Sequence, residues 1–204
     1  MDKAAEILNA GNKVVIIVGQ GALGASDQVT SICELLAAPV VEALLDKAVI
    51  ADDHPYSLGG LGLLGTGPAS DAMNEADTLL MIGTYFLYID YLPKPGQARG
   101  VQIDILPEKI GVRYPVEVGL VGDSRLTLTA LLPLLRRKEN SDFLESKQRA
   151  MRKWISLLEE QGSRNDRPIK PQFVATILSD ELEDDAIISA QPRSHFRKDN
   201  LWLL

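Results

Sequence analysis

Uninterrupted apolar runs alternate with amphipathic stretches along the first two thirds of the chain. The run at residues 14–18, which is Val-Val-Ile-Ile-Val, is typical of a strand buried on both faces of a parallel sheet. Similar runs predict further strands at residues 39–41, 78–82, 100–105 and 116–121. The stretches between them predict helices at residues 4–10, 26–37, 68–75 and 123–135. Ser26 is the expected N-cap of the second helix, and Asp123 or Ser124 that of the fourth.

Strands that alternate with helices at this spacing form βαβ units. The expected fold is therefore α/β: a three-layer, Rossmann-like, doubly wound parallel sheet of about six strands, with extra C-terminal helices. After a charged break at residues 136–140, the pattern predicts a long helix at 142–160, a linker, and a helix from Pro171 to Ser179. Residues 186–189 resemble one more buried strand, and residues 190–204 show no clear period.

Composition narrows the class of protein. Apolar residues make up 46% and charged residues 24%, which is ordinary for a folded globular protein and excludes a mainly disordered chain. The net charge of -7 argues against nucleic-acid binding. No apolar run approaches the roughly 20 residues of a membrane span, and the amphipathic start does not resemble a signal peptide. The single cysteine, Cys33, lies on an apolar helix face and is expected to be a buried thiol, so a reducing cytoplasm fits.

Residues 19–24 carry the first candidate binding motif. Gly19, Gly21 and Gly24 match G-x-G-x-x-G between a strand and a helix, where glycine permits a tight turn and the helix N-terminus attracts a pyrophosphate. Glu42 follows the second strand at about the position of a ribose-binding carboxylate. These residues permit an independent NAD-binding oxidoreductase, although a glycine turn that only connects strand to helix remains an alternative.

A second glycine-rich stretch occupies residues 59–67, and its many backbone donors suit an extended cofactor. Asp104 ends an apolar strand, where its carboxylate can accept hydrogen bonds from ribose hydroxyls. The two glycine loops and Asp104 are expected to converge at one edge of the sheet. No metal site is expected, because His54 and His195 have no acidic or cysteine neighbours at ligand spacing.

Several segments occur in the order seen in one known family: residues 52–56, 59–65, 75–77, 83–86, 102–107 and 121–123. Together they resemble the central domain of thiamine-diphosphate enzymes such as pyruvate oxidase, the quinone-linked pyruvate dehydrogenase and acetolactate synthase. The match at residues 91–99 favours the pyruvate oxidase branch, and the resemblance covers residues 3–189.

The resemblance implies an FAD site in this domain, with ADP or an empty pocket as alternatives. The implied cofactor-binding residues are Leu61, Gly62, Leu63, Leu64, Gly65, Gly83, Thr84, Tyr85, Phe86 and Asp104, with Gly19, Gly21 and Asp123 as weaker candidates. Leu87 and Leu106 stand where the family often has proline and Asp or Asn, which leaves occupancy by FAD open.

The resemblance also implies a domain plan. Residues 1–137 would form the central nucleotide-binding domain, residues 138–189 a helical linker and the start of a C-terminal thiamine-binding domain, and residues 190–204 a tail outside the family pattern. The family's activating glutamate belongs to a domain that would precede Met1, and its Gly-Asp-Gly and Asn-Asn motifs to a C-terminal one. Gly122-Asp123-Ser124 matches the Gly-Asp-Gly motif only superficially.

The chain is therefore expected to be a cofactor-binding or spacer domain of a pyruvate-type 2-oxo acid enzyme, without catalytic activity alone. Thiamine diphosphate and magnesium would belong to the full-length parent. The expected partners are the missing thiamine-binding domains and further copies of the chain. An interaction module with an empty pocket is the remaining alternative.

Overall fold

The computed structural model describes residues 1–43, 49–84, 89–183 and 186. The chain falls into two compact units, Met1–Met151 and Arg152–Leu204. The strand expected at residues 186–189 and the tail at 190–204 lie outside the described residues, apart from Ala186.

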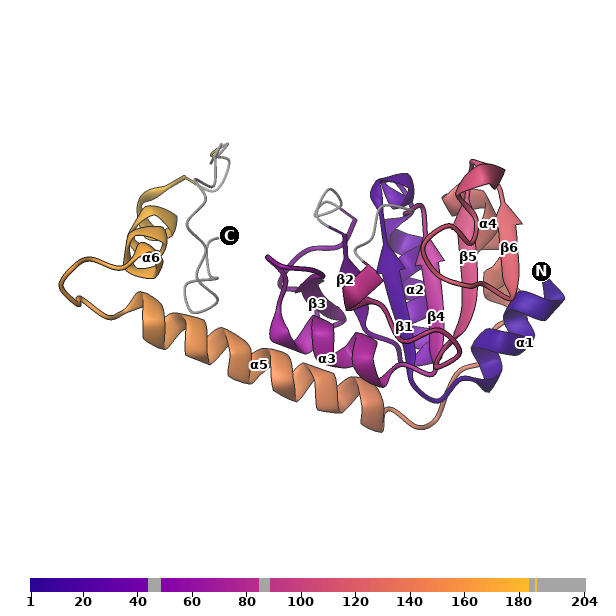
Figure 1. Ribbon diagram of the computed structural model, residues 1–204, viewed down its shortest axis with the longest axis horizontal. Coiled ribbons are helices and arrows are strands. Elements are labelled where there is room, and N and C mark those ends of the chain that lie inside the picture. The colour runs from indigo at the N-terminus through magenta and orange to yellow at the C-terminus, as the bar shows by residue number, and fades with distance from the viewer. Residues whose placement is uncertain (44–48, 85–88, 184–185, 187–204) are drawn as a thin grey trace. The chain divides into compact units, whose positions relative to one another are not determined.

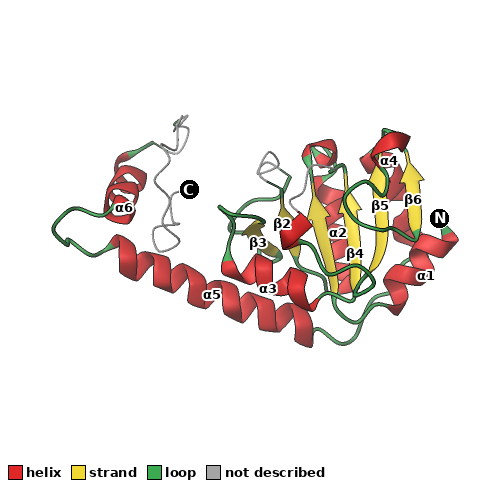
Figure 2. Ribbon diagram, in the orientation of Figure 1, coloured by secondary structure: helices red, strands yellow, loops and turns green. Residues whose placement is uncertain are grey.

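The first unit is built on a six-stranded, entirely parallel sheet (Figure 2). Its strands are β1 (Val14–Val18), β2 (Val40–Glu42), β3 (Ser57–Gly60), β4 (Thr78–Ile82), β5 (Arg99–Asp104) and β6 (Val118–Val121). They lie in the order β3-β2-β1-β4-β5-β6. The chain thus winds outward from β1 in one direction, crosses over, and continues from β4 in the other. This is the doubly wound α/β fold expected from the sequence.

Helices cover both faces of the sheet (Figure 1). The helices are α1 (Asp2–Ala10), α2 (Ser26–Leu36), α3 (Gly67–Glu75), α4 (Ser124–Leu131), α5 (Asp142–Gly162) and α6 (Pro171–Glu181). Short 3-10 turns occur at η1 (Gln20–Ala22), η2 (Ile89–Tyr91), η3 (Pro107–Lys109) and η4 (Leu132–Leu134). Helices α1, α2 and α4 share one core cluster with Val14, Ile16 and Val18 of β1. Helix α3 shares the other with Val15 and Ile17, so successive side chains of one strand fill the two cores.

Strand β3 was not predicted from the sequence. Its four residues are Ser57, Leu58, Gly59 and Gly60, so only Leu58 offers an apolar side chain, and that side chain is fully buried. Glycine has low strand propensity, and the strand forms because β2 supplies a pairing partner. The first two residues of the second glycine-rich stretch, Gly59 and Gly60, therefore belong to the sheet.

Two helix ends also differ from the prediction. The N-cap of α2 is Ala25, with no side-chain cap, and Ser26 is the first helical residue. Helix α4 ends at Leu131 and gives way to η4, whereas the sequence predicted a helix to Leu135. Pro133 explains the early end because it has no amide hydrogen to continue the helical ladder.

The first half of α5 belongs to the first unit. The Lys147 Nζ atom lies 2.8 Å from Glu75 Oε1 at the end of α3, and Gln148 Nε2 donates to the Pro55 carbonyl at 3.0 Å. Phe143 and Met151 pack against the core cluster under α3. The compact unit consequently extends past residue 137, where the sequence suggested a boundary, to Met151.

The second unit holds the remainder of α5 and α6. Gly162 lies against Thr176, where a larger residue would collide with the threonine side chain. Val174, Ile177 and Leu178 of α6 keep 46%, 46% and 54% of their surface exposed. Among the described residues, no helix is long and apolar enough to cross a membrane.

Candidate functional site

The sequence-predicted site residues gather at the carboxyl ends of the six parallel strands. The first glycine loop follows β1, residues 61–65 follow β3, and Gly83 and Thr84 follow β4. Asp104 is the last residue of β5, and Asp123 follows β6. In doubly wound sheets ligands bind outside this edge, next to the point where the winding reverses, which here lies between β1 and β4.

The first glycine loop packs directly on the loop after β4. The Gly19 amide donates to the Ile82 carbonyl at 2.8 Å, and the Gly21 amide donates to the Gly83 carbonyl at 3.0 Å. A Cβ atom on Gly21 would lie 2.8 Å from the Gly83 Cα atom. Two amides that a pyrophosphate would need are therefore already used. The close approach of two backbones accounts for glycine at these positions.

Glu42 is a buried carboxylate. It is the last residue of β2, pairs with Val18 on one side and Gly60 on the other, and has no exposed surface. A ribose-binding carboxylate must face the ligand crevice, so this burial weighs against Glu42 in that role. Together with the occupied amides of the first loop, it disfavours the NAD-binding interpretation.

The second glycine loop presents its backbone differently. The Leu61 amide donates to the Glu42 carbonyl at 2.8 Å, Gly65 to Gly62 at 3.0 Å, and Thr66 to Gly60 at 2.9 Å. Among the hydrogen bonds of the described residues, none uses the amides of residues 62–64. Those amides remain available for a ligand. The side chains of Leu63 and Leu64 are 54% and 38% exposed beside them.

Thr66 fixes this loop to the helix that follows. Its hydroxyl donates to the Leu58 carbonyl at 2.5 Å and accepts a hydrogen bond from the Ala69 amide at 3.1 Å. Thr66 is thus the N-cap of α3 and holds the end of the loop against β3.

Gln102 joins two loops at this edge and was not predicted as a site residue. Its side-chain amide, in the middle of β5 and 2% exposed, donates to the Thr84 carbonyl at 3.3 Å and to the Lys109 carbonyl at 3.1 Å. Its oxygen accepts from the Gly111 amide at 2.8 Å. The sequence feature that could have indicated this role is a polar residue within an otherwise apolar strand. Thr84 is itself buried, while Tyr85, Phe86 and Leu87 lie outside the described residues.

The two candidate aspartates have different surroundings. Asp104 is 6% exposed, and its Oδ1 atom accepts a hydrogen bond from the Leu106 amide at 3.0 Å. The next residues, Ile105 and Leu106, are 68% and 43% exposed. Asp123 instead caps α4, where its Oδ1 atom accepts from the Leu126 amide at 2.9 Å. The Asp123 side chain therefore already has a structural function.

Metal and thiol chemistry have little support in the described part of the chain. No group of three or more His, Cys, Asp or Glu side chains there could hold a metal ion. Cys33 is fully buried, as the sequence predicted, and burial raises the pKa of its thiol well above the ordinary value. A thiol with so high a pKa is a poor nucleophile.

Comparison with known proteins identifies the family. The sequence family described as "Thiamine pyrophosphate enzyme, central domain" matches residues 1–131. The chain is 42% identical to the Bacillus subtilis protein YdaP, whose name describes it as thiamine pyrophosphate-containing, over 91% of this chain and 32% of that protein. It is 25% identical to pyruvate oxidase of Lactiplantibacillus plantarum, over 90% of this chain and 31% of the oxidase.

A solved structure described as a thiamin diphosphate-dependent enzyme from Mycobacterium smegmatis agrees with this. It has a TM-score of 0.56 and 27% identity, over 69% of this chain and 28% of that chain. The chain spans about a third of the length of the curated relatives it matches. The sheet order, the collinear segments and the family match lead to one conclusion: this chain belongs to the thiamine pyrophosphate enzyme family, as a central domain.

Proposed function

We propose that this chain is the cofactor-binding or spacer central domain of a thiamine-diphosphate-dependent enzyme that acts on a pyruvate-type 2-oxo acid. The leading ligand is FAD, held at the carboxyl edge of the sheet, with ADP or an empty pocket as alternatives. Pyruvate oxidase of Lactiplantibacillus plantarum is among the relatives. The observation that carries the proposal is the set of available amides at residues 62–64, which lie at the same edge of the sheet as Asp104.

The chemistry of this edge fits an adenine dinucleotide that lies along the second glycine loop. Amides at residues 62–64 can donate to phosphate or flavin oxygens, and the exposed side chains of Leu63 and Leu64 can contact a ring. Asp104 has a second carboxylate oxygen for a ribose hydroxyl while Oδ1 holds Leu106. Ile105 offers an exposed apolar surface for an adenine beside it.

The domain is proposed to have no catalytic activity alone. The Gly122-Asp123-Ser124 segment, which matches the family's diphosphate motif superficially, forms the N-terminus of α4, and the Asp123 carboxylate is occupied there. Thiamine diphosphate and magnesium would be held by domains of the parent enzyme. Those domains are the expected partners. The exposed Val174, Ile177 and Leu178 of α6 offer them an apolar surface.

Calorimetric titration of the chain with FAD, ADP and NAD tests the proposal. Replacing Asp104 with Asn removes one charge while keeping an oxygen for the Leu106 amide. A hydrogen bond to a charged group contributes about 1.5–3 kcal/mol, so Asp104→Asn should weaken FAD or ADP binding about 10- to 100-fold. Asp71→Asn, on the exposed side of α3, is the matched control and should leave binding unchanged.

Three results would lead elsewhere. Binding of NAD that is lost in Glu42→Gln would overturn the assignment in favour of an NAD domain. Binding of FAD that is insensitive to Asp104→Asn would place the ligand away from this edge. The absence of binding by all three nucleotides would favour the spacer role. We also expect the chain to self-associate in sedimentation experiments. Its proposed location is the cytoplasm.

A further inference from the structure

A cavity of about 580 Å³ opens at the opposite edge of the sheet from the glycine loops. Gly11, Asn12 and Lys13, which immediately precede β1, form one side of it. The other sides are Glu75 at the end of α3 and the segment 136–146, which leads from η4 into α5. All of these residues belong to the first compact unit. The cavity is therefore separate from the proposed nucleotide edge.

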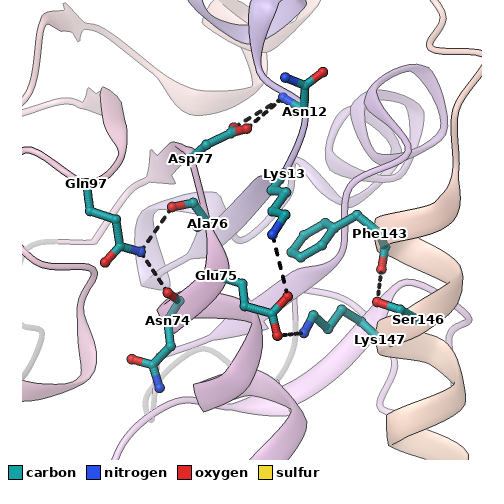
Figure 3. A network of polar contacts seen from close by, with 10 residues as sticks. All are labelled: Asn12, Lys13, Asn74, Glu75, Ala76, Asp77, Gln97, Phe143, Ser146 and Lys147. Atoms are coloured by element: carbon teal, nitrogen blue, oxygen red, sulfur yellow. Dashed lines mark hydrogen bonds and ion pairs between the residues drawn. The ribbon is translucent and has the colours of Figure 1, made fainter.

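Four cationic side chains line this cavity: Lys13, Arg136, Arg137 and Lys138. The carboxylates in its wall are Glu75, Glu139 and Asp142. Glu75 pairs closely with Lys147, whose Nζ atom lies 2.8 Å from its Oε1 atom, whereas Lys13 lies at the longer distance of 3.9 Å from its Oε2 atom (Figure 3). Asp142 lies in the first turn of α5, where the helix dipole favours a negative charge. The positive charge is concentrated in residues 136–138, and Glu139, which follows them, is the remaining carboxylate of the wall.

The three consecutive basic residues are held in place by the fold. The Arg136 amide donates to Asn9 Oδ1 at 2.8 Å, and Asn9 Nδ2 donates to the Leu134 carbonyl at 3.0 Å. The Lys138 amide donates to the Leu35 carbonyl at 2.8 Å, and its ammonium donates to the Gly11 carbonyl. The sequence suggested only a charged break here. The structure instead ties this segment to α1 and α2.

The cations retain capacity for a ligand. No ion pair among the described residues includes Arg136 or Arg137. The one hydrogen bond that either guanidinium makes within this part of the chain is a long one of 3.4 Å, from Arg137 to the Glu34 carbonyl. Burial lowers the pKa of Lys138, so its ammonium is partly removed from water and would gain from an anion nearby. Arg136, Arg137 and Lys138 all line the cavity, and guanidinium and ammonium groups are the side-chain groups that bind a tetrahedral oxyanion.

We propose that this cavity, at the amino ends of the strands, binds a phosphate-type oxyanion through Arg136, Arg137, Lys138 and Lys13. The ligand is either free phosphate or the phosphate group of a larger metabolite, which share the same recognition chemistry. The site is independent of the proposed FAD site because the two lie at opposite edges of the sheet.

Titration of the full chain with inorganic phosphate, followed by amide chemical shifts at low ionic strength, tests the proposal. Saturable shifts are expected at Gly11, Asn12 and residues 136–140. Since charge-assisted bonds from two guanidinium groups are removed, Arg136→Gln/Arg137→Gln should weaken phosphate binding by about tenfold or more. The double variant Arg125→Gln/Arg149→Gln changes the net charge equally at exposed positions outside the cavity and should bind as the parent does.

A second arm separates the two sources of phosphate and guards against a folding defect. This arm uses the Asp104→Asn variant and compares its affinity for ADP with its affinity for inorganic phosphate. If ADP binds more tightly, and if Arg136→Gln/Arg137→Gln weakens that binding, the ligand of the cavity is the phosphate group of a nucleotide. Equal binding would identify the free oxyanion. Lys13→Gln, on the other wall, should weaken phosphate binding with an unchanged thermal midpoint. Lack of saturable phosphate binding, or equal loss in both double variants, would overturn the proposal.

Discussion

The backbones of Gly21 and Gly83 lie in direct contact, so that a Cβ atom on Gly83 would be 2.5 Å from the Gly21 Cα atom. The Gly21 amide also donates to the Gly83 carbonyl at 3.0 Å. These two glycines join the loops after β1 and β4 at the point where the sheet reverses its winding. The first glycine motif thus packs these two loops together, whereas the amides of residues 62–64 in the second glycine loop form no hydrogen bond among the described residues.

Gly83→Ala should destabilise the domain more than Gly24→Ala does. Both residues have a positive φ, 61° and 83°, so each substitution costs about 1–2 kcal/mol in backbone conformation. Only Gly83 is enclosed, whereas a Cβ on Gly24 meets nothing within 4 Å. The collision with Gly21 should add about 1–3 kcal/mol. Urea unfolding of both variants measures the difference, and equal destabilisation would contradict the close packing.

The Lys147–Glu75 pair should respond asymmetrically to substitution. The Lys147 side chain is 6% exposed, and its Nζ atom lies 5.3 Å from the centre of the Phe143 ring. The Glu75 side chain, in contrast, is half exposed (Figure 3). Lys147→Met replaces a nearly buried cation with an apolar chain of similar length and should be close to neutral. Glu75→Gln leaves that cation with a weaker partner and should cost about 1–3 kcal/mol.

Thermal or urea unfolding of the two variants gives the comparison. Glu145→Gln is a suitable control, because the contacts of the Glu145 side chain within the described part of the chain are exposed ones, with Ser141 just before α5 and with Arg149 on α5. If Lys147→Met proved the more damaging change, the ion pair itself would have to stabilise the docking of α5.

Gln102→Met should loosen the two loops that this side chain connects. The substitution leaves the Thr84 and Lys109 carbonyls and the Gly111 amide without their shared partner. An unsatisfied buried polar group costs about 1–3 kcal/mol, so a loss of that order is expected. Hydrogen exchange of the Gly111 amide should become faster. Gln20→Met, at an exposed position in η1, is the control; unchanged exchange at Gly111 would rule out the connecting role.

Glu117 should titrate below an ordinary glutamate. Arg99 donates to both of its carboxylate oxygens at 2.7 Å, and these hydrogen bonds, together with the positive charge, lower the pKa of Glu117. Because the folded pKa is depressed, the stabilisation between β5 and β6 is present above the unfolded pKa. It is lost as the pH falls through the folded pKa.

Carbon NMR of the Glu117 carboxyl group measures this titration. Arg99→Gln should raise the midpoint towards that of a free glutamate, about 4.3. Arg125→Gln removes an equal charge elsewhere and should leave the midpoint in place. A midpoint insensitive to Arg99→Gln would show that the pair is not formed in solution.

The sequence located most of the sheet correctly because its strands are marked by local apolar runs. The runs at residues 14–18 and 78–82 became β1 and β4 with the predicted bounds. Strand β3 could not be found in this way, since Gly59 and Gly60 carry no side-chain pattern and the strand depends on its pairing with β2. The early end of α4 could have been predicted from Pro133.

The candidate site was predicted less completely. The sequence placed Asp104 and both glycine loops at the ends of strands, and parallel topology then brought them to one edge. It could not distinguish glycines that permit loop packing from glycines that leave amides open. It also missed Gln102, whose partners Lys109 and Gly111 acquire meaning only when their loop folds back on β5.

The sequence by itself determined the α/β class, the order of its elements and the family resemblance, because hydrophobic periodicity and local motifs are properties of neighbouring residues. The tertiary structure decided which glycine loop keeps available amides, that Glu42 is buried, and that the first half of α5 docks on the sheet domain. It also brought Lys13 and residues 136–138 around one cavity. Each of these outcomes depends on contacts between residues far apart in the chain, and local patterns do not encode such contacts.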